Sequence, residues 1–234
     1  MAWTADGSAL LDHATFVRQV NVGASSKRNT NLMFAYMDGE YSPAQKFYTG
    51  ADVLLEVGVI NSDDNTYYHL SQLQKMLGKS SGLVTLTQTD HVSAGTVSAD
   101  VELLSDPRPT QDRFTYIFPL RNPEGSWYGG VNTAFGTTPS ITTGGDRPIN
   151  DMIITFSAAG TASHVHAFGT SSLEWAGSGT AIVDVGAKTV VQGSSYVDAD
   201  FVPSDPWWWR FAEASSISVS SSVSITVNWR NRFA

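Results

Sequence analysis

The sequence contains no cysteine, and this absence excludes several kinds of protein. Without thiols there is no disulfide framework, no thiolate nucleophile and no cysteine-ligated zinc or iron–sulfur cluster. Long hydrophobic runs are missing as well, because no apolar stretch approaches the roughly 18 residues that would span a bilayer. The first residues, MAWTADGSALLDH, contain no basic segment followed by an apolar one. We therefore expect no secretory signal, no membrane insertion and synthesis in a cytoplasm.

Charged side chains are scarce too, at 15% of the 234 residues against roughly 25% in an ordinary soluble domain. The 22 acidic residues outnumber the 14 basic residues, which gives a formal net charge of −8 at pH 7. Nucleic-acid binding depends on clustered lysine and arginine, so this balance argues against a protein that grips phosphates. Serine, threonine and glycine fill the places that charged residues leave.

Short apolar stretches broken by polar residues run through 1–130 and predict an antiparallel β fold. The clearest stretch is 51–60, in which Val53, Leu55, Val57 and Val59 share one face at period two. Further strands are predicted at 31–36, 83–89, 100–104 and 113–120.

One segment of this half has a helical period instead. Tyr67, Leu70, Leu73 and Leu77 recur at intervals of three or four residues, which predicts one amphipathic helix near 66–77. Because the helix is short, we expect it to bury its apolar stripe against a sheet.

The segment 129–150 is rich in glycine, threonine and proline and has no period, which is typical of a linker. We therefore predict two domains, 1–144 and 145–234. Strands of the second domain are expected at 152–157, 163–168, 180–185, 189–191 and 216–229. The alternation in the last of these slips at 220–222, which predicts a turn or bulge. The stretch 184–191 reads as a hairpin with Gly186 at its turn.

Residues that could carry chemistry form no recognisable set. No nucleophile elbow, phosphate-binding loop or dinucleotide fingerprint occurs, so we expect no enzymatic activity and no cofactor. His164 and His166 would share a face of one strand, but zinc needs further ligands, and no neighbouring pattern supplies them. We interpret them as ordinary strand histidines and predict no metal site.

Three consecutive tryptophans, Trp207, Trp208 and Trp209, are the most unusual feature. They cannot all face inward on one strand, so at least one is expected at a surface. Aromatic side chains concentrate at protein interfaces, and they also stack on sugar rings. We favour an inter-domain or inter-subunit contact and keep sugar stacking as the second interpretation.

The order of segments in the C-terminal half resembles that of a known family. The 184–191 hairpin, the aromatic stretch SDPWWWRF and the last strand SITVNWRNRF together resemble the galectin-like C-terminal domain of siphophage distal tail proteins. In the N-terminal half, YYHLSQLQKMLGKSSGLVTL and IFPLRNPEGSWYGG are similar to the belt domain of the same family. Three tryptophans stand where the family has one or two aromatics, which leaves a related minor tail protein as an alternative.

The resemblance implies an all-β fold with one short helix, built from a tail-tube-like belt domain and a galectin-like sandwich. It implies a virion protein at the phage tail tip, in a ring, expected to be hexameric, that joins the tail tube to the tail-tip hub or baseplate. Its partners would be copies of itself, the tail tube protein and the hub, with tape-measure and receptor-binding proteins as further candidates. DNA would pass the lumen without specific binding.

A different class of function stays open beside this one. The chain would then be a carbohydrate-binding module of a cell-wall or adhesion protein, with Trp207, Trp208 and Trp209 as its platform. Loss of glycan binding on replacing Trp208 with alanine would favour this alternative.

Overall fold

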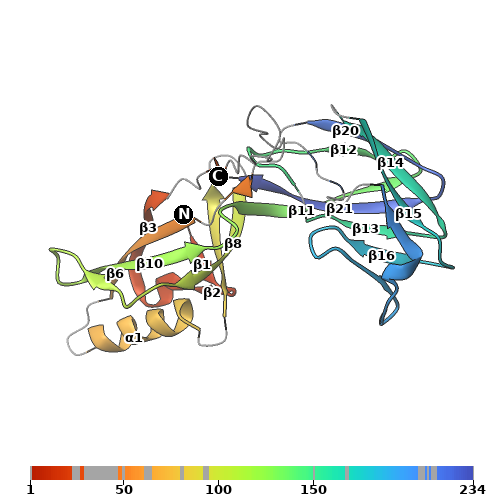
Figure 1. Ribbon diagram of the computed structural model, residues 1–234. Helices are drawn as coiled ribbons and strands as arrows, with labels where there is room; N and C mark the ends of the chain where they lie inside the picture. The colour runs from red at the N-terminus through yellow and green to blue at the C-terminus, as the bar shows by residue number, and fades with distance from the viewer. Residues whose placement is uncertain are drawn as a thin grey trace, which may run out of the picture. The chain divides into compact units, whose positions relative to one another are not determined.

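The structure, a computed structural model, describes residues 2–22, 27–28, 47–48, 51–60, 65–79, 82–91, 95–149, 151–166, 169–204, 209, 211 and 215–233. The chain divides into two units, Met1–Trp127 and Tyr128–Phe233 (Figure 1). Both are built from antiparallel strands, and the one α-helix of the described residues lies in the first unit. The expected all-β class with a single short helix is thus confirmed. Within the described ranges, no helix has the length and apolar character needed to cross a membrane.

Strands of the N-terminal unit follow the spatial order β1-β7-β8-β10-β6-β3, with β2 beside β1 and β9 beside β10. A separate pair is formed by β4 and β5. Their bounds are β1 Trp3–Ala5, β2 Ser8–Ala9, β3 Ala14–Val22, β4 Lys27–Arg28, β5 Phe47–Tyr48, β6 Ala51–Val59, β7 Val84–His91, β8 Gly95–Leu103, β9 Arg108–Pro109 and β10 Thr115–Asn122. A 3₁₀ turn, η1, spans Leu10–Asp12.

The strand β6 confirms the prediction made from its period of two. Val53, Leu55, Val57 and Val59 are all buried, whereas Asp52 on the other face is exposed. Hydrogen bonds join β6 to β10 along one edge and to β3 along the other. The strands expected near 83–89, 100–104 and 113–120 are found as β7, β8 and β10, and the one expected at 31–36 lies outside the described residues.

The helix α1 spans Thr66–Leu77, as its spacing predicts. Leu73 and Leu77 are fully buried, so the apolar stripe packs inward as expected. Tyr67 does not belong to the stripe, since it is 85% exposed in the first turn. Gly78 ends the helix, and its amide donates to the carbonyl of Gln74 at 2.8 Å. A Cβ at Gly78 would lie 2.9 Å from the Leu103 side chain, so glycine allows β8 to approach this end closely.

An ion pair ties the end of α1 to the turn between β1 and β2. Asp6 lies in that turn, where its carboxylate pairs with Lys79 and accepts a hydrogen bond from the Thr85 amide at 2.9 Å. The hydrogen bond from Lys79, followed by that from Thr85, lowers the pKa of Asp6 below its ordinary value of 3.8. The ionised form of the Asp6 carboxylate is therefore more stable in the folded state than in the unfolded state.

Replacing Asp6 with asparagine is expected to lower the stability of the N-terminal unit by about 0.5–1 kcal/mol at pH 7, because the pair is partly exposed. A lowered pKa contributes stability above the unfolded pKa, and that contribution is lost as pH falls through the folded pKa. The difference between wild type and variant should therefore fade as pH drops below 3.8. Urea unfolding at pH 7 and pH 3 measures it, with Asp12→Asn as the exposed control. An equal difference at both pH values would contradict the assignment.

The C-terminal unit contains two antiparallel sheets, ordered β18-β17-β16-β13-β21-β11 and β12-β20-β14-β15-β19. Their bounds are β11 Trp127–Gly136, β12 Ser140–Thr142, β13 Ile153–Phe156, β14 Gly160–His166, β15 Gly169–Trp175, β16 Ala181–Asp184, β17 Thr189–Gln192, β18 Ser195–Tyr196, β19 Phe201–Pro203, β20 Ser216–Ser221 and β21 Ile225–Phe233. A 3₁₀ turn, η2, spans Asp198–Asp200. One buried cluster takes side chains from both sheets, including Phe156, Val183 and Val227 from the first and Leu173 and Val219 from the second. The unit is therefore a β-sandwich.

The slip in alternation predicted at 220–222 marks a change of sheet. β20 pairs with β12 and β14, whereas β21 pairs with β13 in the other sheet. The bend at 222–224 carries the chain across the sandwich, which re-phases the side chains. Val219 and Ile225 consequently both face the same core from opposite sheets.

The prediction of a linker over 129–150 is wrong, because most of this segment belongs to strands of the sandwich. β11 and β12 occupy 127–136 and 140–142, and bridges at Gly145, Arg147 and Ile149 follow. The division after Trp127 accordingly precedes the boundary expected at 144/145. The physical reason is that these strands are rich in glycine, serine and threonine, and their Val131 and Phe135 are exposed. The sequence therefore shows no apolar period from which the strands could be predicted.

The predicted hairpin at 184–191 is present as β16 and β17. Its turn is fixed by Asp184, whose carboxylate accepts a hydrogen bond from the Ala187 amide at 2.8 Å. Gly186 lies in the turn as expected, but the left-handed backbone is at Lys188, with φ of 56°. A Cβ at Gly186 would lie 3.1 Å from Asp151 Cα, so a larger residue there would require Asp151 to shift slightly.

Candidate assembly surfaces

The strand β3 presents a mixed apolar and charged surface, the β3 patch, made of Phe16, Arg18 and Val20. Among the described residues β3 pairs with β6 alone, so it forms an edge of the N-terminal sheet. Phe16 is 39% exposed and Val20 52%, so two large apolar side chains of this strand face solvent. Exposed apolar side chains along a sheet edge are typical of surfaces that contact another chain.

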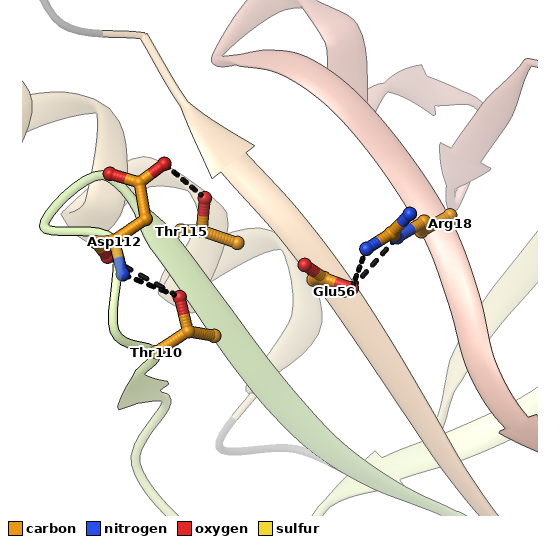
Figure 2. A network of polar contacts seen from close by, with 5 residues as sticks. All are labelled: Arg18, Glu56, Thr110, Asp112 and Thr115. Carbon is orange, nitrogen blue, oxygen red and sulfur yellow. Dashed lines mark hydrogen bonds and ion pairs between the residues drawn. The ribbon is translucent and has the colours of Figure 1, made fainter.

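Arg18 is held in place by neighbours on both sides. Its guanidinium pairs with Glu56 of β6, with Nη2 and Oε2 2.7 Å apart, and Figure 2 shows the two side chains pointing toward each other. The Arg18 guanidinium also lies 5.8 Å from the centre of the Phe16 ring. The patch therefore combines an oriented cation with an aromatic face, a combination found in the centres of protein interfaces.

Phe16 lies across the backbone of β6 at a glycine. A Cβ on Gly58 would come within 2.4 Å of the Phe16 ring, so glycine at this position allows the ring to rest on the strand. The neighbouring Thr15 is bulged out of register and donates a hydrogen bond to the Gly58 carbonyl at 3.1 Å. A second irregularity lies between Gln19 and Asn21. Bulges disturb further strand pairing, so contact through side chains is favoured over extension of the sheet.

A loop before β10 borders the same sheet. Asp112 organises it: its amide donates a hydrogen bond to the Thr110 hydroxyl oxygen at 3.3 Å, and its carboxylate accepts one from the Thr115 hydroxyl at 3.3 Å (Figure 2). The Asp112 carboxylate also accepts from the Phe114 amide, and the Phe114 carbonyl accepts from Val59 at 2.7 Å. The loop is therefore fixed to β6, and it presents the Phe114 side chain, 38% exposed.

The last strand, β21, is held in the C-terminal unit by its WRNR stretch, in which each residue makes a different contact. Trp229 is buried in the core, and the exposed Arg230 lies over the Tyr128 ring at 4.7 Å. The Asn231 side-chain oxygen accepts a hydrogen bond from the Gly144 amide at 2.8 Å. Arg232 is buried and pairs with Asp151 at 2.5 Å. The residues that carry the family resemblance are thus used here to hold β21 to its neighbours.

The tryptophan triplet is described at its last member only. Trp209 is 1% exposed, and its ring meets His164 edge-on at 5.1 Å and Phe211 at 6.0 Å. A side chain buried in this way is not available to stack on a sugar. Trp207 and Trp208 lie outside the described residues.

His164 belongs to the same aromatic cluster. It is 4% exposed and lies 5.5 Å from the Phe211 ring, so it serves as a core residue of β14. His166 follows on the same strand, and its side chain is outside the described part of the chain. In the described residues, no group of three or more histidine, aspartate or glutamate side chains is arranged to hold a metal ion.

The outward face of the five-stranded sheet is lined by hydroxyl groups. Ser140 of β12 pairs in register with Ser218 of β20, and Ser163 of β14 stands between Ser220 and Ser172. Short hydroxyl side chains lose little rotamer freedom when covered and offer both donors and acceptors. This face is a second candidate contact surface.

The β3 patch was not anticipated from the sequence, although a signal was available. The stretch ATFVRQVNV is rich in β-branched residues and has no glycine or proline, which favours a strand. Its exposure, however, depends on where β3 falls in the sheet, and this is a property of the tertiary fold.

Comparison with solved structures shows that the fold is similar to that of a phage protein. One of the matching structures is that of the SPP1 Dit protein, whose crystal structure is described as a paradigm of the hub adsorption apparatus in phages that infect Gram-positive bacteria. The match has a TM-score of 0.73 and covers 100% of this chain and 99% of that chain, at 14% sequence identity. The all-β fold expected from the resemblance to distal tail proteins is therefore confirmed, together with the structural likeness to a protein of that kind.

Two structures of the phage p2 baseplate in its activated conformation also match. The one with Sr has a TM-score of 0.47 and 11% identity, covering 98% of this chain and 97% of that chain. The one with Ca has a TM-score of 0.44 and 12% identity, covering 92% and 90%. At these scores neither adds to the assignment. No family model and no curated protein sequence matches the chain.

Proposed function

We propose that this protein is a structural component of a phage tail tip, which assembles into a ring of six copies that joins the tail tube to the hub or baseplate. The observation that carries the proposal is the likeness to the SPP1 hub protein along the whole of both chains. A match that includes both units favours the same kind of assembly, because either unit alone is a common β architecture. The protein acts by contact, without catalysis.

The ring contact is assigned to the β3 patch. A ring needs a head-to-tail interface in which two different surfaces of the same chain meet. The β3 patch supplies one of them, with Phe16 and Val20 as apolar anchors and Arg18 as the oriented charge. Large permanent interfaces are more apolar than ordinary surface, which fits the low charge content of this chain.

Further roles follow from the same proposal. The C-terminal sandwich contacts hub or receptor-binding proteins, with tape-measure protein as another partner, and its hydroxyl-lined face suits such a contact. A net charge of −8 suits a lumen through which DNA passes without binding. Trp207 and Trp208 are kept as proposed contact residues, for a partner protein or for a glycan.

Replacing both Phe16 and Val20 with aspartate is expected to abolish ring formation, with the association constant lowered about hundredfold or more, because central apolar anchors dominate interface energies. Both side chains are already partly exposed, so the variant should fold. Sedimentation and electron microscopy of the purified chain measure the assembly. The matched control is the double variant Ile182→Asp and Tyr196→Asp, which adds the same two charges at exposed positions of the other unit, 46% and 74% exposed.

Two outcomes would contradict the proposal at different levels. If the variant assembled as well as wild type, the ring contact would lie elsewhere. If the chain were absent from the tail end in labelled micrographs of the virion, the tail-tip role itself would be wrong. The second measurement does not depend on rings that survive purification.

A further inference from the structure

Two histidines from different elements of the N-terminal unit meet nitrogen to nitrogen. His13 ends the η1 turn just before β3, and His69 lies in the second turn of α1. Their Nδ1 atoms are 3.1 Å apart, and the ring centres are separated by 5.3 Å. Both residues are half-buried, so solvent reaches the pair.

The backbone around each histidine is fixed. The His13 amide donates to the Leu10 carbonyl at 3.1 Å, and its carbonyl accepts from Ile60 at 3.2 Å. The His69 amide donates to the Asn65 carbonyl at 3.0 Å. Tyr68 adds an edge-on ring contact to His13 at 6.0 Å. The two Nδ1 atoms are therefore brought together by rigid elements, a condition that a binding site requires.

We propose that His13 and His69 form a two-histidine site for a divalent transition metal such as Zn²⁺ or Ni²⁺, which would staple α1 to the start of β3. Imidazole nitrogen binds these ions at about 2.0–2.1 Å. Two nitrogens 3.1 Å apart subtend about 100° at such an ion, between the 90° of octahedral and the 109° of tetrahedral coordination. Water completes the remaining positions, since the pair is open to solvent.

The pair also forms a hydrogen bond when no metal is bound. One ring then carries its proton on Nδ1 and donates it to the Nδ1 lone pair of the other. Metal binding needs both Nδ1 lone pairs, so the donor ring moves its proton through solvent to Nε2. Calcium and magnesium prefer oxygen ligands and should not bind here.

The test uses the full chain with NiCl₂ or ZnCl₂, and with MgCl₂ as the inactive ion. At a free metal concentration of ten times the dissociation constant, we expect the unfolding temperature of the N-terminal unit to rise by about 3–6 °C. The variants His13→Asn and His69→Asn should each lose this shift and bind metal at least tenfold more weakly. Asparagine keeps a hydrogen-bonding group close to the position of Nδ1, so the metal-free fold is preserved. His91→Asn is the matched control and should behave as wild type.

A second measurement on unaltered protein removes any dependence on the variants. In ¹⁵N spectra of the histidine side chains, added Zn²⁺ should shift the Nδ1 signals of His13 and His69 together. The proposal is overturned if wild type shows no shift in unfolding temperature, if either single variant keeps it, or if only one of the two Nδ1 signals responds. In those cases the pair is a hydrogen bond alone.

Discussion

Replacing Trp209 with alanine is expected to destabilise the C-terminal sandwich by about 3–5 kcal/mol, the usual cost of removing a buried aromatic side chain. Trp209 is 1% exposed and its ring packs against those of His164 and Phe211, so its removal leaves a cavity beside these two rings. Its indole nitrogen has no hydrogen-bond partner within the described residues, so apolar packing is the main loss. The unfolding temperature of this unit should fall by more than about 10 °C.

Two comparisons sharpen this prediction. Trp209→Phe should recover most of the stability, because it restores a ring in the same place. Tyr196→Ala, at an aromatic residue that is 74% exposed, should change stability by less than about 0.5 kcal/mol. Thermal unfolding followed by near-ultraviolet circular dichroism measures all three. A Trp209→Ala variant as stable as wild type would show that this side chain is not part of the core.

The result also decides how the tryptophan triplet is to be tested. Loss of binding in a Trp209→Ala variant would report a damaged sandwich, since Trp209 supports the core. Trp207 and Trp208 are therefore the positions at which a contact with a glycan or partner has to be examined. The expectation that three adjacent tryptophans cannot all face inward leads to the same choice.

The sequence predicts well those helices and strands in which buried apolar residues recur at regular intervals. The buried face of β6 is predictable because every second residue is apolar and buried. The helix α1 is predictable because its apolar residues recur every third or fourth position. The crossing between β20 and β21 is legible for the same reason, because a change of sheet interrupts the alternation at 222–224. These are local signals, and the strand or helix that carries them can be read without its partners.

Contacts between residues that are distant in the chain could not be predicted from the sequence. β11 reads as a linker because its glycines, Asn132 and Thr133 leave no apolar pattern, and only its pairing with other strands makes it part of a sheet. His13 and His69 lie 56 residues apart, and no spacing rule brings their nitrogens together. The β3 patch is hidden for a related reason, since the edge position of β3 follows from the order of strands.

A second large effect is expected at one of these distant contacts, the docking of the 144–147 loop on β21. Gly145 has a φ of +85°, and a Cβ there would lie 2.0 Å from the Arg232 carbonyl oxygen. That same oxygen accepts hydrogen bonds from the Asp146 amide at 3.0 Å and the Arg147 amide at 3.2 Å. A side chain at Gly145 therefore strains the backbone and pushes the loop away from its acceptor.

Gly145→Ala should consequently cost about 2–5 kcal/mol, from the left-handed strain and two weakened hydrogen bonds. The matched control is Gly193→Ala, at a φ of +60° with no atom within 4 Å of the new Cβ, which should cost about 1–2 kcal/mol from strain alone. Chemical unfolding measures both variants, and hydrogen exchange at Asp146 and Arg147 reports whether the loop has detached. Equal losses in the two variants, with both amides still protected in Gly145→Ala, would mean that the close approach to Arg232 does not stabilise the sandwich. The expected difference would instead establish that the segment read as a linker is an integral part of the C-terminal unit.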